Sequence, residues 1–220
     1  MFGPIKAVIF DMDGVLVDSE PLWRKAMIKG FNSYGVAFTE QDCRKTTGMR
    51  FKEVVDIWLN HYDLKHITNH EVETNVLDAL VDLIGNEGKP MPGALEALNY
   101  VKQSGLKIGL ATSSSHRLLS AVLKKLELEN FFQAEVSAES MAYGKPHPEV
   151  FLVCAELLDI YPNSCLVIED SINGVIAAKA AQMRAIAVPD IEHMHMKQFA
   201  VADYQCESMQ DVLKLFKELF

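Results

Sequence analysis

The sequence predicts an α/β protein in which a doubly wound (Rossmann-like) parallel sheet carries an inserted all-helical subdomain. Apolar runs typical of buried strands alternate with helical patterns throughout the second half of the chain. A block of helical patterns without a convincing strand separates the first apolar run from that alternation. We therefore expect a core domain formed by residues 1–18 and 89–220, and a helical insert formed by residues 19–88.

The first strand is expected at Ala7-Val8-Ile9-Phe10, an apolar run typical of a strand buried on both faces. Asp11 and Asp13 follow it, and Gly14 lets the chain turn away. Ligands of open α/β sheets bind beyond the carboxyl ends of the strands, so both carboxylates would project into that crevice. A further strand-end carboxylate would complete a site for a hard cation such as Mg²⁺. The alternative is that both aspartates only solvate a turn.

The helical insert follows directly. Asp18 or Ser19 is placed to cap a first helix, which has Pro21 in its first turn and ends at Gly35. Two further apolar stripes have helical spacing, Phe51, Val54, Val55 and Trp58 in one and Val72, Val76, Leu80 and Ile84 in the other. The segment 89–93, rich in proline and glycine, marks the return to the core.

Strands and helices alternate through the rest of the chain, as a doubly wound sheet requires. The expected strands are residues 107–111, 134–137, 165–168 and 185–188. The helices between and after them carry apolar stripes within residues 95–104, 118–126, 148–158, 171–181 and 209–216.

Polar residues stand at the ends of four of these strands. Besides Asp11 and Asp13, the segments are Thr112-Ser113-Ser114-Ser115, Gly144-Lys145-Pro146-His147-Pro148 and Glu169-Asp170-Ser171. Hydroxyls and helix-opening amides suit a phosphate, a lysine neutralises charge, and carboxylates suit a cation. Each segment has a plainer interpretation as a helix cap or a solvated turn. Their coincidence at one edge of one sheet favours a functional site.

Composition narrows the class of protein. The 220 residues include 21 basic and 30 acidic side chains, for a formal charge of −9, and no polybasic run. This excludes nucleic acid and anionic membrane as expected partners, whereas a small phosphorylated metabolite remains compatible. The four cysteines have no Cys-x-x-Cys spacing, and Cys154 and Cys165 are expected to be reduced core thiols. With no signal peptide or membrane span in the pattern, we expect a cytoplasmic, monomeric enzyme.

The ordered motifs Asp11-x-Asp13-Gly14, Thr112, Lys145 and Glu169-Asp170 resemble those of the haloacid dehalogenase superfamily of phosphatases. The resemblance covers the whole chain and is to the subgroup with a helical cap inserted after the first motif. That subgroup includes sugar-phosphate phosphatases, phosphoglycolate phosphatase and β-phosphoglucomutase. Residues 11–23 are similar to the 2-deoxyglucose-6-phosphatase-like members.

The resemblance implies a role for each motif residue. Asp11 would be the nucleophile that forms an aspartyl-phosphate, and Asp13 the general acid and then the general base. Mg²⁺ would be held by the Asp11 carboxylate, the Asp13 backbone carbonyl and Asp170. Glu169 would be either a direct ligand of the ion or a partner of one of its ligands.

The remaining motif residues would bind the phosphoryl group. Thr112 and the Ser113 amide, with Ser114 beside them, would hold its oxygens, and Lys145 would neutralise charge on nucleophile and phosphate. Asn173 would hold Lys145 or the edge of the phosphate.

In the cap, segment 46–50 resembles the specificity loop of these relatives. It offers Gly48 and Arg50 to the substrate, and Glu20 and Trp23 would face the same cavity. Arg50 has the alternative interpretation of a surface residue at a helix terminus. Ser115 and His116 are further candidates for the sugar. The pair His193-x-His195 lies in an apparent loop that we expect to face solvent, and it receives no role.

Within the superfamily, two residues favour a phosphatase. Dehalogenases and phosphonatases lack the second aspartate, which is present here as Asp13, so Lys45 and Lys52 are interpreted as surface charges rather than as a phosphonatase-type cap lysine. Trp23 stands where mutase relatives carry a cap histidine, and it can donate a hydrogen bond but cannot titrate near neutral pH.

The sequence thus predicts a Mg²⁺-dependent phosphatase of small phosphorylated metabolites, with hexose phosphates as the expected substrates. The alternatives are a sugar phosphomutase and a catalytically silent sugar-phosphate-binding protein. Intact Asp11, Asp13, Lys145 and Asp170 argue against the silent protein.

Overall fold

A computed structural model describes residues 3–46 and 49–220. Its centre is a six-stranded, fully parallel sheet of order β3-β2-β1-β4-β5-β6. The strands are β1 (Ala7–Phe10), β2 (Lys107–Thr112), β3 (Ala134–Ser137), β4 (Cys165–Glu169), β5 (Arg184–Ala187) and β6 (Tyr204–Gln205). Short 3₁₀ segments follow β3 (Ala138–Ser140), precede β4 (Pro162–Ser164) and lie between β5 and β6 (Lys197–Val201).

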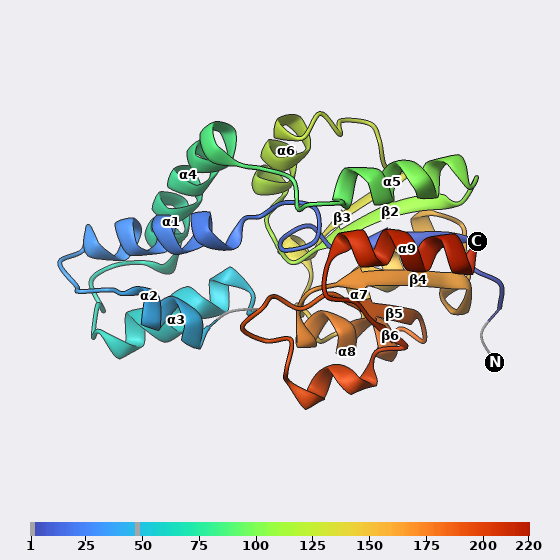
Figure 1. Ribbon diagram of the computed structural model, residues 1–220. Helices are drawn as coiled ribbons and strands as arrows, with labels where there is room; N and C mark the ends of the chain where they lie inside the picture. The colour runs from blue at the N-terminus through green and yellow to red at the C-terminus, as the bar shows by residue number, and fades with distance from the viewer. Residues whose placement is uncertain (1–2, 47–48) are drawn as a thin grey trace.

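The first strand, β1, shows why both faces of the sheet are covered by helices. Its side chains alternate between two buried clusters, as the strand period of two dictates. Val8 and Phe10 belong to the cluster that includes α5 (Ala94–Gln103), α6 (His116–Lys125) and α9 (Met209–Leu219). Ala7 and Ile9 belong to the cluster that includes α7 (Glu149–Leu157) and α8 (Ile172–Ala180). The result is a three-layer α/β core (Figure 1).

The strand order reverses at β1, which pairs with β2 on one side and with β4 on the other. In doubly wound sheets such a reversal opens a crevice at the carboxyl ends of the strands. The residues that follow β1, β2 and β4 therefore meet at one edge, which positions the site described below.

The helical insert comprises α1 (Glu20–Asn32), α2 (Glu40–Lys45), α3 (Phe51–His61) and α4 (Asn69–Glu87). Figure 1 shows these helices as a separate lobe beside the sheet. The two connections to the core run side by side: Asp18 N–H donates to the Lys89 carbonyl at 3.0 Å and Met91 N–H to the Leu16 carbonyl at 2.9 Å. The predicted fold class, a Rossmann-like core with an inserted helical cap, is confirmed; the limits 18/19 and 88/89 stay predictions.

The cap has an aromatic interior. The ring of Phe38 stacks on Phe31 with centroids 4.5 Å apart and meets Trp58 edge-on at 5.1 Å. Helix α4 packs against α1 within the cap and against α6 of the core. An ion pair between Arg117 and Asp78 joins the same two parts at the surface. The apolar stripes predicted for the cap are thus its buried faces.

Some local predictions differ from the structure. Ser19 occupies the N-cap position of α1, yet its side chain makes no capping bond, because the hydroxyl binds Asp13 instead. Strand β6 and helix α2 were not predicted individually, since two and six residues are too few for a periodic signal. In the part of the chain that the structure describes, no helix is both long enough and apolar enough to cross a membrane.

Two helical glycines test the packing of the cap. A Cβ on Gly30 would lie 2.3 Å from Cγ2 of Val76, a fully buried and β-branched side chain that cannot easily move, whereas a Cβ on Gly85 would meet nothing within 4 Å. We expect Gly30→Ala to lower the free energy of unfolding by about 1–3 kcal/mol through overpacking of α1 against α4. Gly85→Ala should raise it by roughly 0.5–1 kcal/mol through helix propensity.

Urea denaturation of both variants and the parent measures the two effects. Effects of the same sign and size for the two glycines would contradict close packing at Gly30.

Candidate active site

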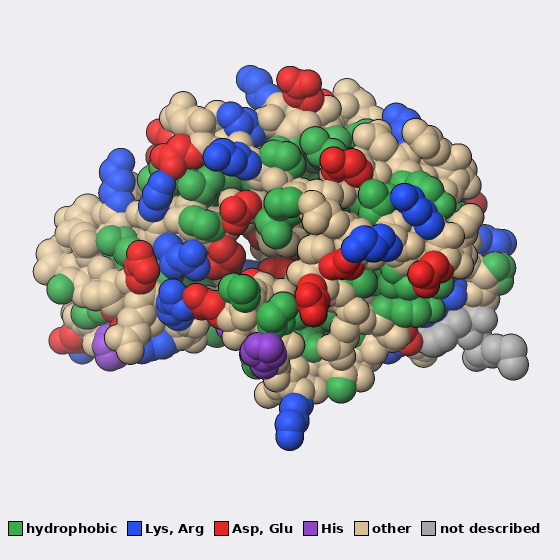
Figure 2. Space-filling model, in the orientation of Figure 1, with side chains coloured by type: hydrophobic (Ala, Val, Ile, Leu, Met, Phe, Trp, Pro, Cys, Tyr) green, Lys and Arg blue, Asp and Glu red, His purple; other side chains and the backbone are tan. Residues whose placement is uncertain are grey.

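A cavity of about 610 Å³ lies at the carboxyl edge of the sheet, and both the core and the cap line it. Figure 2 shows a hollow near the centre of the view with acidic side chains around it. Leaving aside the sugar candidates Ser115 and His116, the lining includes eleven of the twelve residues predicted for catalysis, metal binding or substrate binding: Asp11, Asp13, Glu20, Arg50, Thr112, Ser113, Ser114, Lys145, Glu169, Asp170 and Asn173. The twelfth, Gly48, lies outside the described residues.

Lys145 is the centre of this arrangement. Its Nζ donates to Oδ1 of Asp11 and to Oε1 of Glu169, both at 2.5 Å, and to the carbonyl of Ala111 at 3.1 Å. The three partners come from the ends of β1, β4 and β2. Burial opposes the charge on Lys145, but the carboxylates of Asp11 and Glu169 outweigh it and raise the pKa of the ammonium group. The lysine is therefore a fixed positive charge in an almost water-free place, with its side chain 5% exposed.

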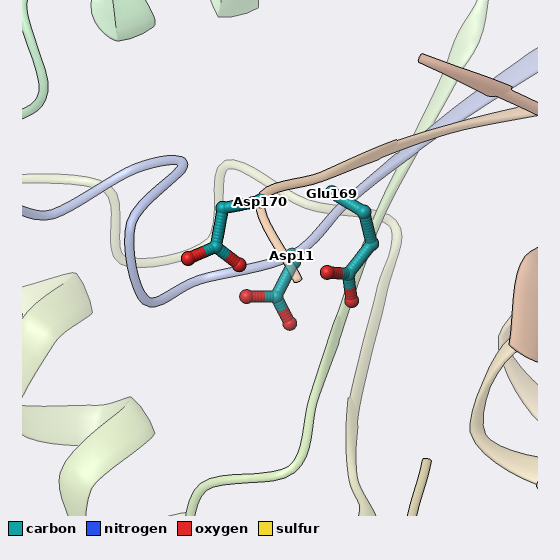
Figure 3. A group of neighbouring side chains, drawn as sticks. All are labelled: Asp11, Glu169 and Asp170. Atoms are coloured by element: carbon teal, nitrogen blue, oxygen red, sulfur yellow. The ribbon is translucent and has the colours of Figure 1, made fainter. Parts of the chain in front are cut away.

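The carboxylates of Asp11, Glu169 and Asp170 form a compact group. One oxygen from each lies within 4.8 Å of the others, and Figure 3 shows Asp11 between the other two at the ends of neighbouring strands. Burial raises the pKa of Asp11 to about 8 against the opposing effect of Lys145. Burial, with the charges of Glu169 and Asp11, also raises the pKa of Asp170. Three carboxyl groups thus face one ammonium group, so the cluster has too little positive charge to balance three ionised carboxylates.

The residues of this group suit a bound divalent cation. The donors are all carboxylate oxygens, which hard cations prefer. Two glycines make the room: a Cβ on Gly14, whose φ is +72°, would lie 2.2 Å from Oδ2 of Asp170, and one on Gly174 would lie 1.8 Å from Oε1 of Glu169. The Asp13 side chain does not belong to the group, so its predicted part in metal binding rests on its backbone carbonyl alone and stays a prediction.

Asp13 is held by three donors. Ser19 Oγ and Trp23 Nε1 donate to Oδ1 at 2.5 and 3.2 Å, and Ser114 Oγ donates to Oδ2 at 2.7 Å. Ser19 and Trp23 belong to the start of the cap, at the N-terminus of α1 and within it, whereas Ser114 follows β2 of the core. The carboxylate is therefore fixed in orientation while remaining part of the cavity wall.

The segment after β2, whose role in binding phosphate stays a prediction, lines the cavity. Thr112 is 1% exposed, and its Oγ1 accepts the backbone N–H of Ser114 at 3.0 Å. Ser115 caps α6 by accepting the N–H of Leu118 and also lines the cavity. His116, the other candidate for the sugar, is exposed and is not part of the lining.

Cap residues reach the cavity from α1 and from the start of α3. Arg50 is half-buried at the N-cap of α3, where Nη1 donates to the carbonyl of Met141 at 3.0 Å and Nε lies 3.5 Å from the Glu53 carboxylate. It therefore joins the cap to the core loop around Met141 and is not a simple surface residue. Glu20 lines the cavity as predicted, and burial raises the pKa of its carboxyl.

Sequence reasoning missed two features of the site. Gly174, which leaves room for Glu169, follows it by five residues, and only the turn into α8 brings them together. His193, expected to face solvent without a role, lines the cavity with its side chain 38% exposed, whereas His195 is outside the lining and exposed. The fold of the loop after β5 separates these two histidines, and no periodic pattern encodes that.

The fold and this cluster together define a capped α/β protein whose acidic site suits a phosphate group and a hard cation. A family model described as haloacid dehalogenase-like hydrolase matches residues 5–182. The chain belongs to this family, as its motifs predicted.

Two curated relatives and one solved structure illustrate the relationship. Hexitol phosphatase B of Escherichia coli strain K12 is 39% identical over 209 residues, which cover 94% of each chain. The phosphorylated carbohydrates phosphatase of Thermotoga maritima is 37% identical over 188 residues, 83% of this chain and 84% of the relative. The crystal structure of β-phosphoglucomutase from Clostridium difficile has a TM-score of 0.83 and 26% identity, with 98% of this chain and 96% of that chain covered.

The charge imbalance in the cluster predicts how stability depends on pH. In metal-free protein, the unfolded chain releases the protons of Asp11 and Asp170 near their ordinary pKa values, whereas the folded chain holds them to higher pH. Between about pH 4 and pH 8 the folded state binds more protons, so stability falls as pH rises. Lys145 keeps its charge throughout, because its pKa is raised.

We expect the melting temperature of EDTA-treated protein to fall by roughly 2–8 °C from about pH 5 to about pH 8, equivalent to about 1–2 kcal/mol. Mg²⁺ should raise it more at the higher pH, because protons and the cation compete for the same oxygens. Differential scanning fluorimetry measures both, and Asp170→Asn serves as the control for other titrating groups. An Asp170→Asn protein with the same pH slope and the same response to Mg²⁺ as the parent would refute this interpretation.

Proposed function

We propose that the protein is a Mg²⁺-dependent phosphatase that hydrolyses small phosphorylated carbohydrates through an aspartyl-phosphate at Asp11. The observation that carries the proposal is the contact of Lys145 Nζ with the Asp11 carboxylate, at the strand ends and on the wall of the cavity. Membership of a hydrolase family and the phosphatase names of close relatives support the reaction class.

In the first step, the free carboxylate oxygen of Asp11 attacks phosphorus. The bond from phosphorus to the leaving oxygen breaks, and Asp13 gives that oxygen a proton. Lys145 holds the nucleophile in place and offsets negative charge on the phosphoryl oxygens, and Thr112 with the Ser113 amide positions those oxygens.

In the second step, Asp13 takes a proton from a water molecule. The water oxygen attacks phosphorus, the bond to the Asp11 oxygen breaks, and inorganic phosphate leaves with the Asp11 carboxylate restored. Ser19, Trp23 and Ser114 keep Asp13 in one orientation through both proton transfers.

Asp11 and Asp170 would hold the Mg²⁺ ion, with the Asp13 carbonyl as a further ligand and Glu169 beside them in the same carboxylate cluster. When bound, the cation neutralises the excess negative charge of the cluster and of the phosphate. Glu169 is already engaged on both oxygens, by Lys145 on Oε1 and by the amide and hydroxyl of Ser171 on Oε2. We therefore assign it mainly to the orientation of Lys145.

The carbohydrate part of the proposal rests on the cavity and on the relatives. About 610 Å³ is ample for a six-carbon phosphate ester. The relatives named above act on hexitol phosphates and on phosphorylated carbohydrates, as their names state. Hexose and hexitol phosphates are accordingly the proposed substrates.

The second candidate, a sugar phosphomutase, is favoured by the structural similarity to β-phosphoglucomutase. A mutase must keep its phospho-aspartate until a sugar hydroxyl arrives, so it must restrain Asp13 from activating water. Here the residue that contacts Asp13 from α1 is Trp23, whose indole N–H donates a hydrogen bond but does not titrate near neutral pH. We therefore place hydrolysis first.

Two isosteric substitutions test the assigned chemistry. We expect Asp11→Asn to lose nearly all turnover of p-nitrophenyl phosphate with Mg²⁺, because an amide oxygen is a poor nucleophile. Asp13→Asn should lose about 10²–10⁴-fold with a sugar phosphate, for which proton transfer to the leaving oxygen is needed. Steady-state phosphate release measures both.

Asp18→Asn is the matched control, since Asp18 lies in the same segment, is exposed and does not line the cavity. It should keep wild-type turnover. Near-normal activity of either Asp11→Asn or Asp13→Asn would remove that residue from the mechanism.

Product analysis separates the two candidate functions. With β-glucose 1-phosphate and a trace of β-glucose 1,6-bisphosphate, we expect any turnover to yield free phosphate, because Trp23, which contacts Asp13 from α1, does not titrate near neutral pH. Glucose 6-phosphate and phosphate are followed together by coupled assay. Sustained formation of glucose 6-phosphate with little phosphate would establish the mutase instead.

A further inference from the structure

The loop that follows β5, residues 189–196, forms part of the cavity wall from the core side. Asp190, His193 and Met196 belong to the lining, and none of them has a part in the chemistry described above. Glu20 of α1 lines the same cavity, and the nearby Asp190 carboxylate adds to the effect of burial in raising the pKa of Glu20. This part of the wall therefore combines an imidazole with two carboxyl groups.

Asp190 fixes the conformation of the loop and the orientation of the imidazole. Its Oδ1 accepts the backbone N–H groups of Glu192 and His193 at 2.8 and 2.9 Å. Its Oδ2 lies 2.8 Å from Nδ1 of His193. Because a carboxylate can only accept, the hydrogen bond assigns the proton of the neutral ring to Nδ1. Nε2 is then the second polar atom of the ring, with a lone pair in the neutral form.

The loop also contacts the cap. Glu192 forms an ion pair with Arg44 of α2 on the surface. Such an exposed pair contributes little energy, but it places the loop where the cap meets the core. A residue here can meet the part of a substrate that extends from the strand ends toward the cap.

The charges nearby indicate which chemical group fits. Asp190 and Glu20 would disfavour a second phosphate or a carboxylate close to His193. A hydroxyl group can donate to the lone pair on Nε2 of the neutral imidazole while the Nδ1 proton stays on Asp190. Neutral hydroxyl groups are what a carbohydrate monophosphate carries away from its phosphate.

We propose that His193, oriented by Asp190, is a specificity-determining residue that hydrogen bonds a hydroxyl group in the carbohydrate part of the substrate. The proposal rests on the proposed phosphatase function and extends it to the core-side loop, beyond the predicted cap residues.

The test compares His193→Ala with His195→Ala, a control in the same loop that is exposed and absent from the cavity wall. The substrates are sorbitol 6-phosphate, which carries hydroxyls, and p-nitrophenyl phosphate, which carries none. For His193→Ala we expect KM for sorbitol 6-phosphate to rise about 3- to 10-fold, the loss of one hydrogen bond, with kcat changed less than about 2-fold. The kcat/KM for p-nitrophenyl phosphate should stay within about 2-fold.

Two further variants sharpen the result. His193→Gln should recover part of the lost affinity, because its amide can reach the position of Nε2 and still donate or accept. Asp190→Asn should raise KM for sorbitol 6-phosphate in the same direction, since the amide no longer fixes the imidazole. His195→Ala should behave as wild type with both substrates.

Three results would overturn the proposal: an unchanged KM for sorbitol 6-phosphate, an equal loss with both substrates, or an equal effect of His195→Ala. Hydrolysis of p-nitrophenyl phosphate but of no hydroxyl-bearing phosphate by the wild type would also overturn it. A wild-type protein that releases phosphate from neither substrate would overturn the proposed function itself, so the two failures are distinguishable.

Discussion

One buried ammonium group, Nζ of Lys145, is the contact on which the rest of the site depends. It binds the ends of three neighbouring strands at once, through Asp11, Glu169 and the carbonyl of Ala111. A lysine removed from water requires such partners, and the carboxylates require it equally. The sheet order β2-β1-β4 is what brings these partners within reach.

The surrounding residues are adapted to this cluster at some cost to local structure. Gly14 and Gly174 leave space for the carboxylates of Asp170 and Glu169, and a Cβ at either position would collide with them. Ser19 gives its hydroxyl to Asp13 and leaves the N-terminus of α1 without a side-chain cap, which elsewhere is worth about 1 kcal/mol. Departures from local rules of this kind concentrate at functional sites. Here these departures keep two aspartates in distinct environments. Asp11 accepts a hydrogen bond from Lys145, whereas Asp13 accepts hydrogen bonds from two hydroxyl groups and one indole N–H.

The sequence was sufficient for the fold and for the central residues because their signals are local or topological. Short apolar runs predicted β1, β2, β3, β4 and β5, and the strand-end rule predicted that Asp11, Lys145 and Glu169 would meet. The use of the Ser19 hydroxyl was not predictable, because the same group suits a helix cap and an aspartate equally well. The contact of Arg50 with the Met141 carbonyl joins residues far apart in the chain, and the position of His193 depends on the path of one loop. Such features appear only once the cap and the core are in place.

The central claim, that Asp11 becomes phosphorylated, is tested most directly by trapping the intermediate. In Asp13→Asn protein with Mg²⁺ and p-nitrophenyl phosphate, the leaving group needs no proton but water is not activated, so the phospho-enzyme should accumulate. After acid quench, borohydride reduces an acyl phosphate to an alcohol, and mass spectrometry of the peptide spanning Ala7 to Arg24 locates the change. We expect homoserine at position 11 alone. Reduction at another carboxylate, or none in protein that still releases p-nitrophenol, would contradict it.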